Sequence, residues 1–146
     1  MEPLVVEFDL RVAPEVAFAV WAERCGTWWP PDHTISGDPA AIVVQPVAGG
    51  RIFERGRDGT EHDWGRVLRW EPPVRVVYLW HMFFPPEEAT EVEVTFHARG
   101  DGTRVVITQR GWERLGDAGP PRRERTGQVW SGLSTHFVAV AEGGGR

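Results

Sequence analysis

The sequence of 146 residues contains no lysine, a single cysteine, a single tyrosine and no long apolar run. All 16 basic residues are therefore arginines, and 21 acidic residues leave a net charge of −5. Such an acidic chain is poorly suited to the phosphates of a nucleic-acid duplex, so no nucleic-acid partner is expected. The lone Cys25 excludes an internal disulfide and predicts a reducing, cytoplasmic location. The apolar stretches are too short to span a membrane, and the first residues do not resemble a signal peptide.

What the chain has in excess is large flat side chains, with eight tryptophans and seven phenylalanines. Apolar residues make up 41% and charged residues 25%, which is typical of a folded globular protein. The length predicts one domain over residues 1–146, with a flexible glycine-rich tail at residues 143–146. This surplus of aromatic residues predicts that the domain lines a wide apolar space.

Hydrophobic periodicity divides the chain into four parts. Leu4 to Val12 alternates as a strand, and Pro14 then begins a short helix, with a second short turn predicted at residues 27–29. Six β-rich runs follow, separated by Gly, Pro and Asp-Gly turn signals. They are Ile42–Val44, Arg51–Arg55, His62–Trp70, Val74–Phe83, Glu91–Ala98 and Arg104–Gln109. From Pro121 to Ala141 the pattern returns to helical spacing.

This order of elements predicts an α+β fold of the helix-grip type. A curved antiparallel sheet of about seven strands wraps around a long C-terminal helix, and two short helices follow the first strand. A straight helix that lies across a concave sheet touches the rims more easily than the centre. The fold therefore predicts an apolar cavity between the sheet and the helix.

Strand alternation predicts which side chains line that cavity. On the helix, the small residues Ser131, Gly132, Ser134 and Thr135 are expected to face the sheet and leave room. The predicted ligand-binding residues are Trp28, Tyr78, Trp80, Phe96, Ile107, Gln109, Trp130 and Ser134. An apolar wall with a few polar groups is typical of a small-molecule site. The alternative is that Gly132 permits close helix–sheet packing with no cavity.

Two residues are candidates for acid–base chemistry. Glu54 shares a strand face with Ile52, and a carboxylate against apolar walls would have a raised pKa. The alternative for Glu54 is an ion pair with an arginine such as Arg66. His33 follows the Trp28–Asp32 segment in a loop expected near the cavity mouth.

The other titratable groups favour structural roles. His62 and Asp63 are strand neighbours and so point to opposite faces, while His81 is expected to face away from the cavity. Arginines 122, 123 and 125 begin the last helix, where they are either solvated, paired with acids or available to an anionic ligand group. No metal-ligand spacing, nucleophile motif or phosphate loop is present, so neither a metal nor a cofactor is expected.

A series of short motifs extends along nearly the whole chain. They are Ala13-Pro14-Glu15, Trp28-Trp29, Gly49-Gly50-Arg51-Ile52, Asp58-Gly59, Trp64-Gly65-Arg66-Val67, Trp70-Glu71-Pro72-Pro73, Trp80-His81, Gln109 to Gly116 and Trp130 to Phe137. Together they resemble the activator of heat-shock protein 90 ATPase homologue-like family of the START-like superfamily, also called SRPBCC or Bet v 1-like. The family often has histidine where this chain has Gln109, and a Gly-Trp pair where it has Val129-Trp130. The resemblance implies a helix-grip fold with a hydrophobic cavity.

Three functions remain open on the sequence. The first is binding of a small hydrophobic or aromatic molecule, which is not expected to require catalysis. The second is a cyclase- or hydratase-type enzyme that uses Glu54 or His33 in the same cavity. The third is protein interaction, either co-chaperone-like or as a homodimer joined through Val77 and Leu79, which are expected to be exposed.

Overall fold

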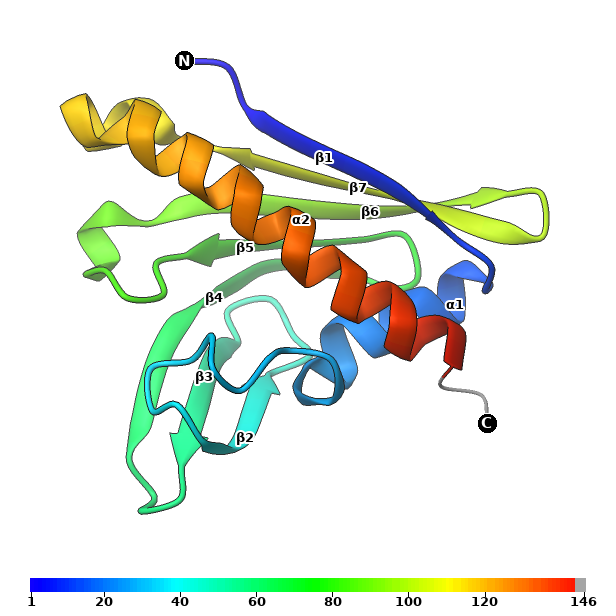
Figure 1. The fold of residues 1–146 in the computed structure, drawn as a ribbon, viewed down its shortest axis with the longest axis horizontal. Helices are drawn as coiled ribbons and strands as arrows, with labels where there is room; N and C mark the ends of the chain where they lie inside the picture. Colours follow the sequence, from blue (N-terminus) through cyan, green and yellow to red (C-terminus); the bar gives the residue numbers. More distant parts are fainter. Residues whose placement is uncertain (144–146) are drawn as a thin grey trace.

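The computed structural model describes residues 1–143 and shows one sheet, one long helix and several short helical segments (Figure 1). The strands are β1 (Leu4–Leu10), β2 (Pro39–Val44), β3 (Arg51–Gly56), β4 (Glu61–Glu71), β5 (Arg75–Trp80), β6 (Thr90–Arg99) and β7 (Gly102–Arg110). The helices are α1 (Pro14–Phe18), a π-helical turn at Ala19–Glu23, 3-10 turns at Cys25–Thr27, Pro86–Glu88 and Trp112–Ala118, and α2 (Gly119–Gly143). Gly143 thus still belongs to α2, whereas the rest of the expected tail, residues 144–146, lies outside the described residues.

The sheet contains seven strands in the order β1-β7-β6-β5-β4-β3-β2, and every neighbouring pair is antiparallel. Strands β2 to β7 follow one another as hairpins, and the Asp58–Gly59 signal marks one of the turns, where Gly59 has a positive φ. Strand β1 comes from the start of the chain and pairs with β7, Leu4 opposite Gln109. The predicted helix-grip architecture is confirmed.

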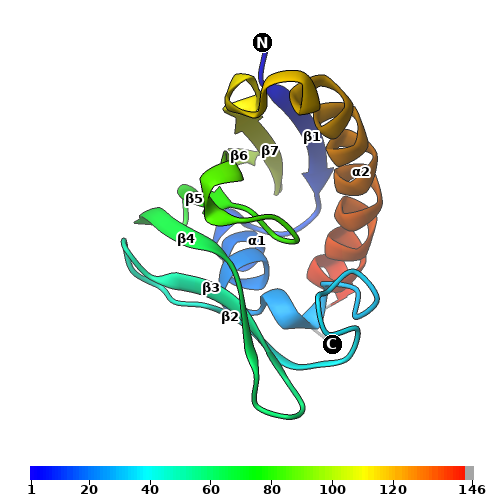
Figure 2. The same cartoon turned by 90° about the vertical axis from the view of Figure 1, so that its left-hand side faces the viewer.

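The sheet curls strongly, and Figure 2 shows it bending around toward α2. Register shifts interrupt three of its pairings, including those between Ile52 and Phe53 and between Val67 and Arg69. Each shift places an extra residue in one strand, which bends the strand and increases its twist. At the shift between β3 and β4 the extra residue is Trp64, and its side chain is fully buried.

Helix α2 lies along the concave face of the sheet, beside β1 (Figures 1 and 2). Its buried side chains repeat at helical spacing, as predicted, and they are Trp130, Leu133, Ser134, Phe137 and Ala141. The expectation that Ser131, Gly132 and Thr135 also face the sheet is wrong, because all three are exposed. At about 100° per residue, these positions fall outside the stripe that Trp130 and Phe137 define.

Indole rings fill the centre of the space between sheet and helix. Trp21 packs against Trp28, Trp130 and Phe137 with ring centroids 4.7, 5.8 and 4.8 Å apart. Trp29 packs against Trp28 at 5.4 Å. The gap that remains among these rings and strands β3 to β5 is about 20 Å³, room for about one water molecule. Residues that connect β1 to β2 therefore occupy most of the room that the curvature creates.

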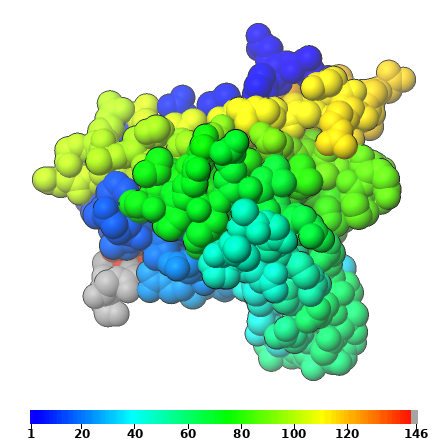
Figure 3. Space-filling view, turned by 180° about the vertical axis from the view of Figure 1, so that it is seen from behind, coloured from blue at the N-terminus to red at the C-terminus, as the bar shows by residue number. Residues whose placement is uncertain are grey.

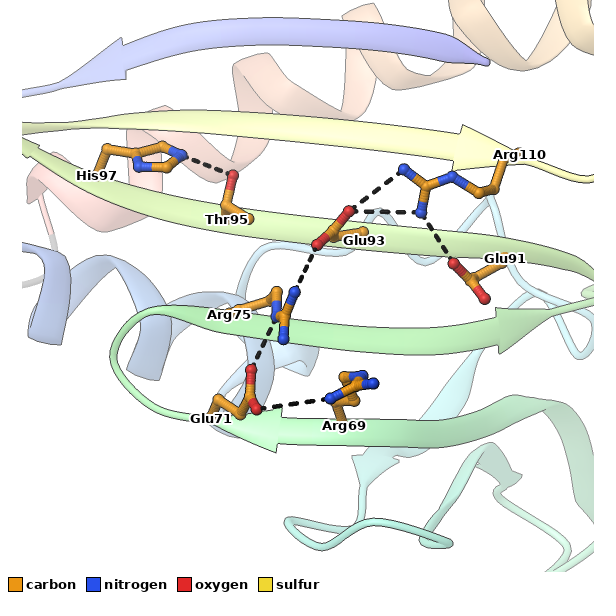
Figure 4. A network of polar contacts seen from close by, with 8 residues as sticks. All are labelled: Arg69, Glu71, Arg75, Glu91, Glu93, Thr95, His97 and Arg110. Carbon is orange, nitrogen blue, oxygen red and sulfur yellow. Dashed lines mark hydrogen bonds and ion pairs between the residues drawn. The ribbon is translucent and has the colours of Figure 1, made fainter. Parts of the chain in front are cut away.

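The outer face of the sheet is covered by charged side chains. Seen from behind, the strands form this surface and hide most of α2 (Figure 3). A chain of ion pairs crosses β4 to β7 (Figure 4), and its residues are Arg69, Glu71, Arg75, Glu93, Arg110 and Glu91. Val77 lies between Arg69 and Glu93 in register and is only 5% exposed. The expectation that Val77 is exposed is therefore wrong, because long charged side chains flank it and cover apolar surface with their stems.

Candidate functional site

A cavity of about 240 Å³ lies between the sheet and α2 at one end of the grip. It lies between the first half of α2, the segment that joins β5 to β6, and the ends of β5 and β7, where Trp112 also contributes. Figure 1 shows the green β5–β6 segment at the same end of the molecule as the beginning of α2. The predicted cavity therefore exists, but the tryptophans displace it from the centre toward this end.

The cavity walls are mainly apolar. They are formed by the side chains of Trp80, Met82, Phe84, Trp112, Val129, Trp130 and Leu133. Six polar groups converge with them, namely His33, His81, Glu88, Thr90, Gln109 and Thr126, and two arginines, Arg122 and Arg125, complete the lining. Large aromatic walls with a few polar groups are the usual composition of a small-molecule site.

Gln109 provides the most deeply buried polar group of the cavity, at 2% exposure. Its Oε1 accepts a hydrogen bond of 2.7 Å from Nε1 of Trp130, and its Nε2 donates one of 2.8 Å to Oγ1 of Thr90. The indole Nε1 of Trp112 donates a hydrogen bond of 2.9 Å to the backbone oxygen of Gln109. Gln109 thus links β7 to β6, to α2 and to the turn after β7.

A stacked arginine forms one side of the cavity mouth. The Arg122 guanidinium lies 3.5 Å from the ring centroid of Phe84 and pairs with Glu88 at 2.8 Å. These two contacts fix both the arginine and the β5–β6 segment that carries Phe84 and Glu88. Arg125, one helical turn further on, is exposed at the cavity lining. The third arginine of the cluster, Arg123, donates to the backbone oxygens of residues 2 and 3.

Two histidines reach the cavity. His33 lies in the loop after Trp29, as predicted, and its ring contacts those of Trp29 and Phe83 at 5.9 and 5.7 Å. Burial lowers the pKa of His33 and nearby Asp32 offsets this only in part, so the imidazole is neutral at neutral pH.

His81 also lines the cavity, so the expectation that it faces away is wrong. Strand β5 ends at Trp80, and beyond this point the chain leaves the sheet and no longer alternates. The Nδ1 of His81 lies 3.0 Å from the carbonyl oxygen of Phe84. Since a carbonyl oxygen only accepts, Nδ1 carries a hydrogen, and Nε2 lies 3.8 Å from an Asp63 carboxylate oxygen.

Glu54 points inward as predicted, but it is not a free acid in the cavity. Its carboxylate accepts hydrogen bonds from the backbone N–H groups of Ile35 and Ser36, the Ser36 hydroxyl and the Trp64 indole. Burial alone would raise the pKa of Glu54, but these bonds outweigh it and hold the pKa below its ordinary value. The expectation of a raised pKa is therefore wrong, and so is the alternative of an ion pair with Arg66.

The structure separates the predicted ligand-binding residues into three groups. Trp80, Gln109 and Trp130 line the 240 Å³ cavity, while Trp28, Tyr78 and Trp80 line the small central gap. Phe96, Ile107 and Ser134 are buried but line neither space. Phe96 packs against Phe18 at 5.3 Å, and the Ser134 hydroxyl has no hydrogen-bond partner within residues 1–143.

Several lining residues were not predicted from the sequence. They are Phe84, Thr90, Trp112, Val129 and Leu133, together with the side chains of Glu88 and Thr126. Phe84, Glu88, Thr90 and Trp112 lie in connections or at the ends of elements, where alternation gives no direction for a side chain, and the other three lie on α2. The indole of Trp112 could have been found from its place directly after β7, opposite the start of the last helix.

Two other kinds of site are absent from the part of the chain that the structure describes. Within residues 1–143, no helix is both long and apolar enough to cross a membrane. No group of three or more His, Cys, Asp or Glu side chains in the same range is arranged to hold a metal ion.

The fold and the cavity define a helix-grip protein of the START-like class. The family model of the Activator of Hsp90 ATPase homolog 1-like proteins matches residues 11–140, so the chain belongs to this family. No curated protein matches the chain.

Solved structures share the fold over most of the chain. The anthrahydroquino-γ-pyrone synthase Txn09, in complex with SUM, is 33% identical over 82% of each chain, with a TM-score of 0.59. CalC, a self-sacrificing resistance protein from Micromonospora echinospora, is 24% identical over 96% of this chain and 94% of its own, with a TM-score of 0.74. The Aha1 dimer from Colwellia psychrerythraea is 16% identical over 97% of both chains, with a TM-score of 0.72.

Proposed function

We propose that this protein binds a small hydrophobic or aromatic molecule in the 240 Å³ cavity. The observation that carries the proposal is the cavity itself, with indole walls from Trp80, Trp112 and Trp130 and polar groups that converge on the same space. A cavity of about 150 Å³ already admits benzene, so this one has room for a larger ring system. Flat rings also stack favourably against indoles.

The energetics agree with a ligand of this kind. Each Å² of apolar ligand surface removed from water stabilises the complex by about 25 cal/mol. Micromolar affinity corresponds to about 8 kcal/mol, which an aromatic molecule that fills the cavity can approach without a charged contact. Because the walls are held by interlocking aromatic contacts, little ordering of side chains opposes binding.

The experiment uses 8-anilinonaphthalene-1-sulfonate, an aromatic probe whose fluorescence rises in apolar sites. Its acidic group also suits the arginines at the mouth. We expect saturable fluorescence with one site per chain and a rise in Tm with probe concentration. Val129→Trp, which fills the cavity from α2, should weaken binding at least tenfold. Ala139→Trp places the same side chain on the exposed face of α2 and should leave binding unchanged.

Three results would overturn the proposal. The first is that the probe shows no saturable binding, and the second is that both tryptophan variants bind it equally well. The third is that the probe binds the unfolded protein but not the folded protein. Circular dichroism of the two variants establishes that each is folded before the comparison is made.

A second candidate is catalysis in the same cavity, of the cyclase or hydratase type. It is favoured by the two imidazoles of His33 and His81 at the cavity and by the 33% identity to a protein described as a synthase. We expect a linear poly-β-ketone thioester to lose water and cyclise in the presence of this protein. His33→Gln and His81→Gln should lower that rate while retaining probe binding. If mass spectrometry shows no protein-dependent product, this candidate fails and the binding function stands alone.

The protein-interaction alternative has less support. The likeness to the Aha1 dimer is at 16% identity and concerns the fold. Val77, which was expected to form an apolar dimer face, is covered by the charged side chains of the outer sheet. A homodimer stays a prediction that light scattering can test.

A further inference from the structure

The orientation of the Gln109 side chain is fixed by its neighbours. The indole Nε1 of Trp130 can only donate a hydrogen bond, so the amide atom 2.7 Å from it must be the oxygen, Oε1. Nε2 then faces the opposite side, where it donates to Thr90 Oγ1 at 2.8 Å. Exchanging the oxygen and nitrogen of the amide would place two donors against each other, so this arrangement is unambiguous.

One donor of this amide remains unused. Nε2 carries two hydrogens, and among the residues that the structure describes only Thr90 Oγ1 accepts from it. Gln109 is 2% exposed and lines the cavity, so bulk water has little access to the second hydrogen. A buried donor that lacks an acceptor is unfavourable by about 1–3 kcal/mol. A ligand that supplies an acceptor removes this deficit on binding.

The neighbouring groups favour the same kind of partner. Thr90 Oγ1 already accepts from Gln109, and its own hydrogen points to the Trp80 carbonyl oxygen at 3.5 Å, the outer limit of a hydrogen bond. The indole N–H groups of Trp112 and Trp130 are both occupied by Gln109 oxygens. At the buried end of the cavity, the oxygens of Gln109 and Thr90 thus each accept one hydrogen bond, whereas one N–H of Gln109 has no acceptor within residues 1–143. A buried N–H without an acceptor is rarer in proteins than an oxygen with one unused lone pair, so the N–H is the group that favours a ligand partner.

We propose that Gln109 is a specificity-determining residue and that the cavity selects aromatic molecules with a carbonyl oxygen. The second Nε2 hydrogen of Gln109 donates to that oxygen at the buried end, while the ring system stacks among the tryptophans. The chemical class is that of aryl ketones, quinones and pyrones. This inference rests on the proposed binding function and adds to it the polar group by which the ligand is recognised.

The test compares 1-tetralone with tetralin, two fused-ring molecules that differ by one carbonyl oxygen. Affinities of both are measured by displacement of the fluorescent probe from wild-type protein and from three variants. Gln109→Glu keeps an acceptor for Trp130 but replaces the donor group with an oxygen. Gln109→Met removes both polar atoms at similar volume, and Gln128→Met makes the same change at an exposed position of α2 that lies outside the cavity.

We expect Gln109→Glu and Gln109→Met to weaken 1-tetralone about tenfold and to change tetralin less than twofold, because only the ketone loses a hydrogen bond. Gln128→Met should change neither affinity. Should Gln109→Met fail to fold, Gln109→Glu and the side-chain amide signals of wild-type Gln109 decide the matter. One of its two Nε2–H resonances should shift with 1-tetralone and stay in place with tetralin.

The outcomes separate this inference from the binding function. The role of Gln109 is overturned if the Gln109 variants lose affinity for 1-tetralone and tetralin equally, or if neither Nε2–H resonance shifts when 1-tetralone is added. The binding function stands in both cases. If wild-type protein binds neither compound nor the fluorescent probe, the binding function itself fails.

Discussion

The indole Nε1 of Trp64 donates a hydrogen bond of 2.9 Å to Oε1 of Glu54, and both side chains are fully buried. The irregular register of β3 and β4 turns Trp64 toward this carboxylate. The same carboxylate holds the backbone of Ile35 and Ser36. Glu54 therefore fastens the loop that follows Trp29, and with it His33, to the curved sheet.

Replacing this carboxylate should destabilise the fold. Glu54→Gln turns one acceptor atom into a donor that faces N–H or O–H groups, so at least one bond is lost and donors are left unpaired. We expect the free energy of unfolding in urea to fall by about 2–4 kcal/mol. Glu61→Gln, at an exposed residue paired with Arg51 and Arg55, should lower it by less than about 1 kcal/mol. Equal effects of the two changes would contradict the buried role of Glu54.

The stability contributed by Glu54 should depend on pH. Its pKa in the folded protein lies below the ordinary value of 4.5, so folding favours the ionised form. This contribution is fully present above pH 4.5 and is lost as the pH falls through the folded-state pKa. Urea unfolding between neutral and acidic pH should therefore show a steeper loss of stability in wild-type protein than in Glu54→Gln. Parallel curves for the two proteins would show that Glu54 titrates alike in both states.

The exposed Gly132 should accept a side chain with a gain in stability. A Cβ at this position meets nothing within 4 Å, and alanine is about 1 kcal/mol more favourable than glycine inside a helix. We expect Gly132→Ala to raise the free energy of unfolding by about 0.5–1 kcal/mol. Gly65→Ala is the contrasting variant, because its Cβ would overlap the backbone oxygen of Leu79 in the paired strand. A thermal melt in which Gly132→Ala is the less stable of the two would refute this assignment.

Cys25 should be unreactive in the folded protein. Burial raises the pKa of its thiol to about 12, and the thiolate is the reactive form. We expect iodoacetamide at pH 8 to leave the native protein unmodified and to modify it fully in urea, as measured by mass spectrometry. Rapid modification without denaturant would mean that the wall around Cys25 opens readily.

Alternation along the strands was sufficient to predict the inward side chains of β5, β6 and β7. Tyr78, Phe96, Ile107 and Gln109 are all buried, because an antiparallel sheet with one covered face alternates strictly between core and outside. The predicted strands agree with the structure to within three residues at each end, and the largest differences are the start of β2 at Pro39 and the early end of β5 at Trp80. It is this early end that brings His81 into the cavity lining.

Predictions that depended on contacts between different helices, strands and loops were less accurate. Four small residues of α2 were expected to face the sheet, and only Ser134 does so. Composition does not determine how a helix is rotated, and Trp130 and Phe137 occupy most of that face. The pKa of Glu54 was expected to rise because the carboxylate lies among apolar side chains. The expectation was wrong because hydrogen-bond donors from the loop at residues 35–36, distant in the sequence, lower that pKa. The cover over Val77 likewise comes from neighbouring strands.

The sequence by itself determined the helix-grip order of elements and the inward faces of the strands, since these follow from local spacing of apolar residues. The resemblance of its short motifs indicated the family. Only the tertiary structure decided where the empty space lies, because that depends on how Trp21, Trp28 and Trp29 fill the centre. The tertiary structure also decided which buried N–H groups have no hydrogen-bond acceptor. Hydrogen-bond partners such as Gln109 and Trp130 are 21 positions apart, and folding alone brings them together.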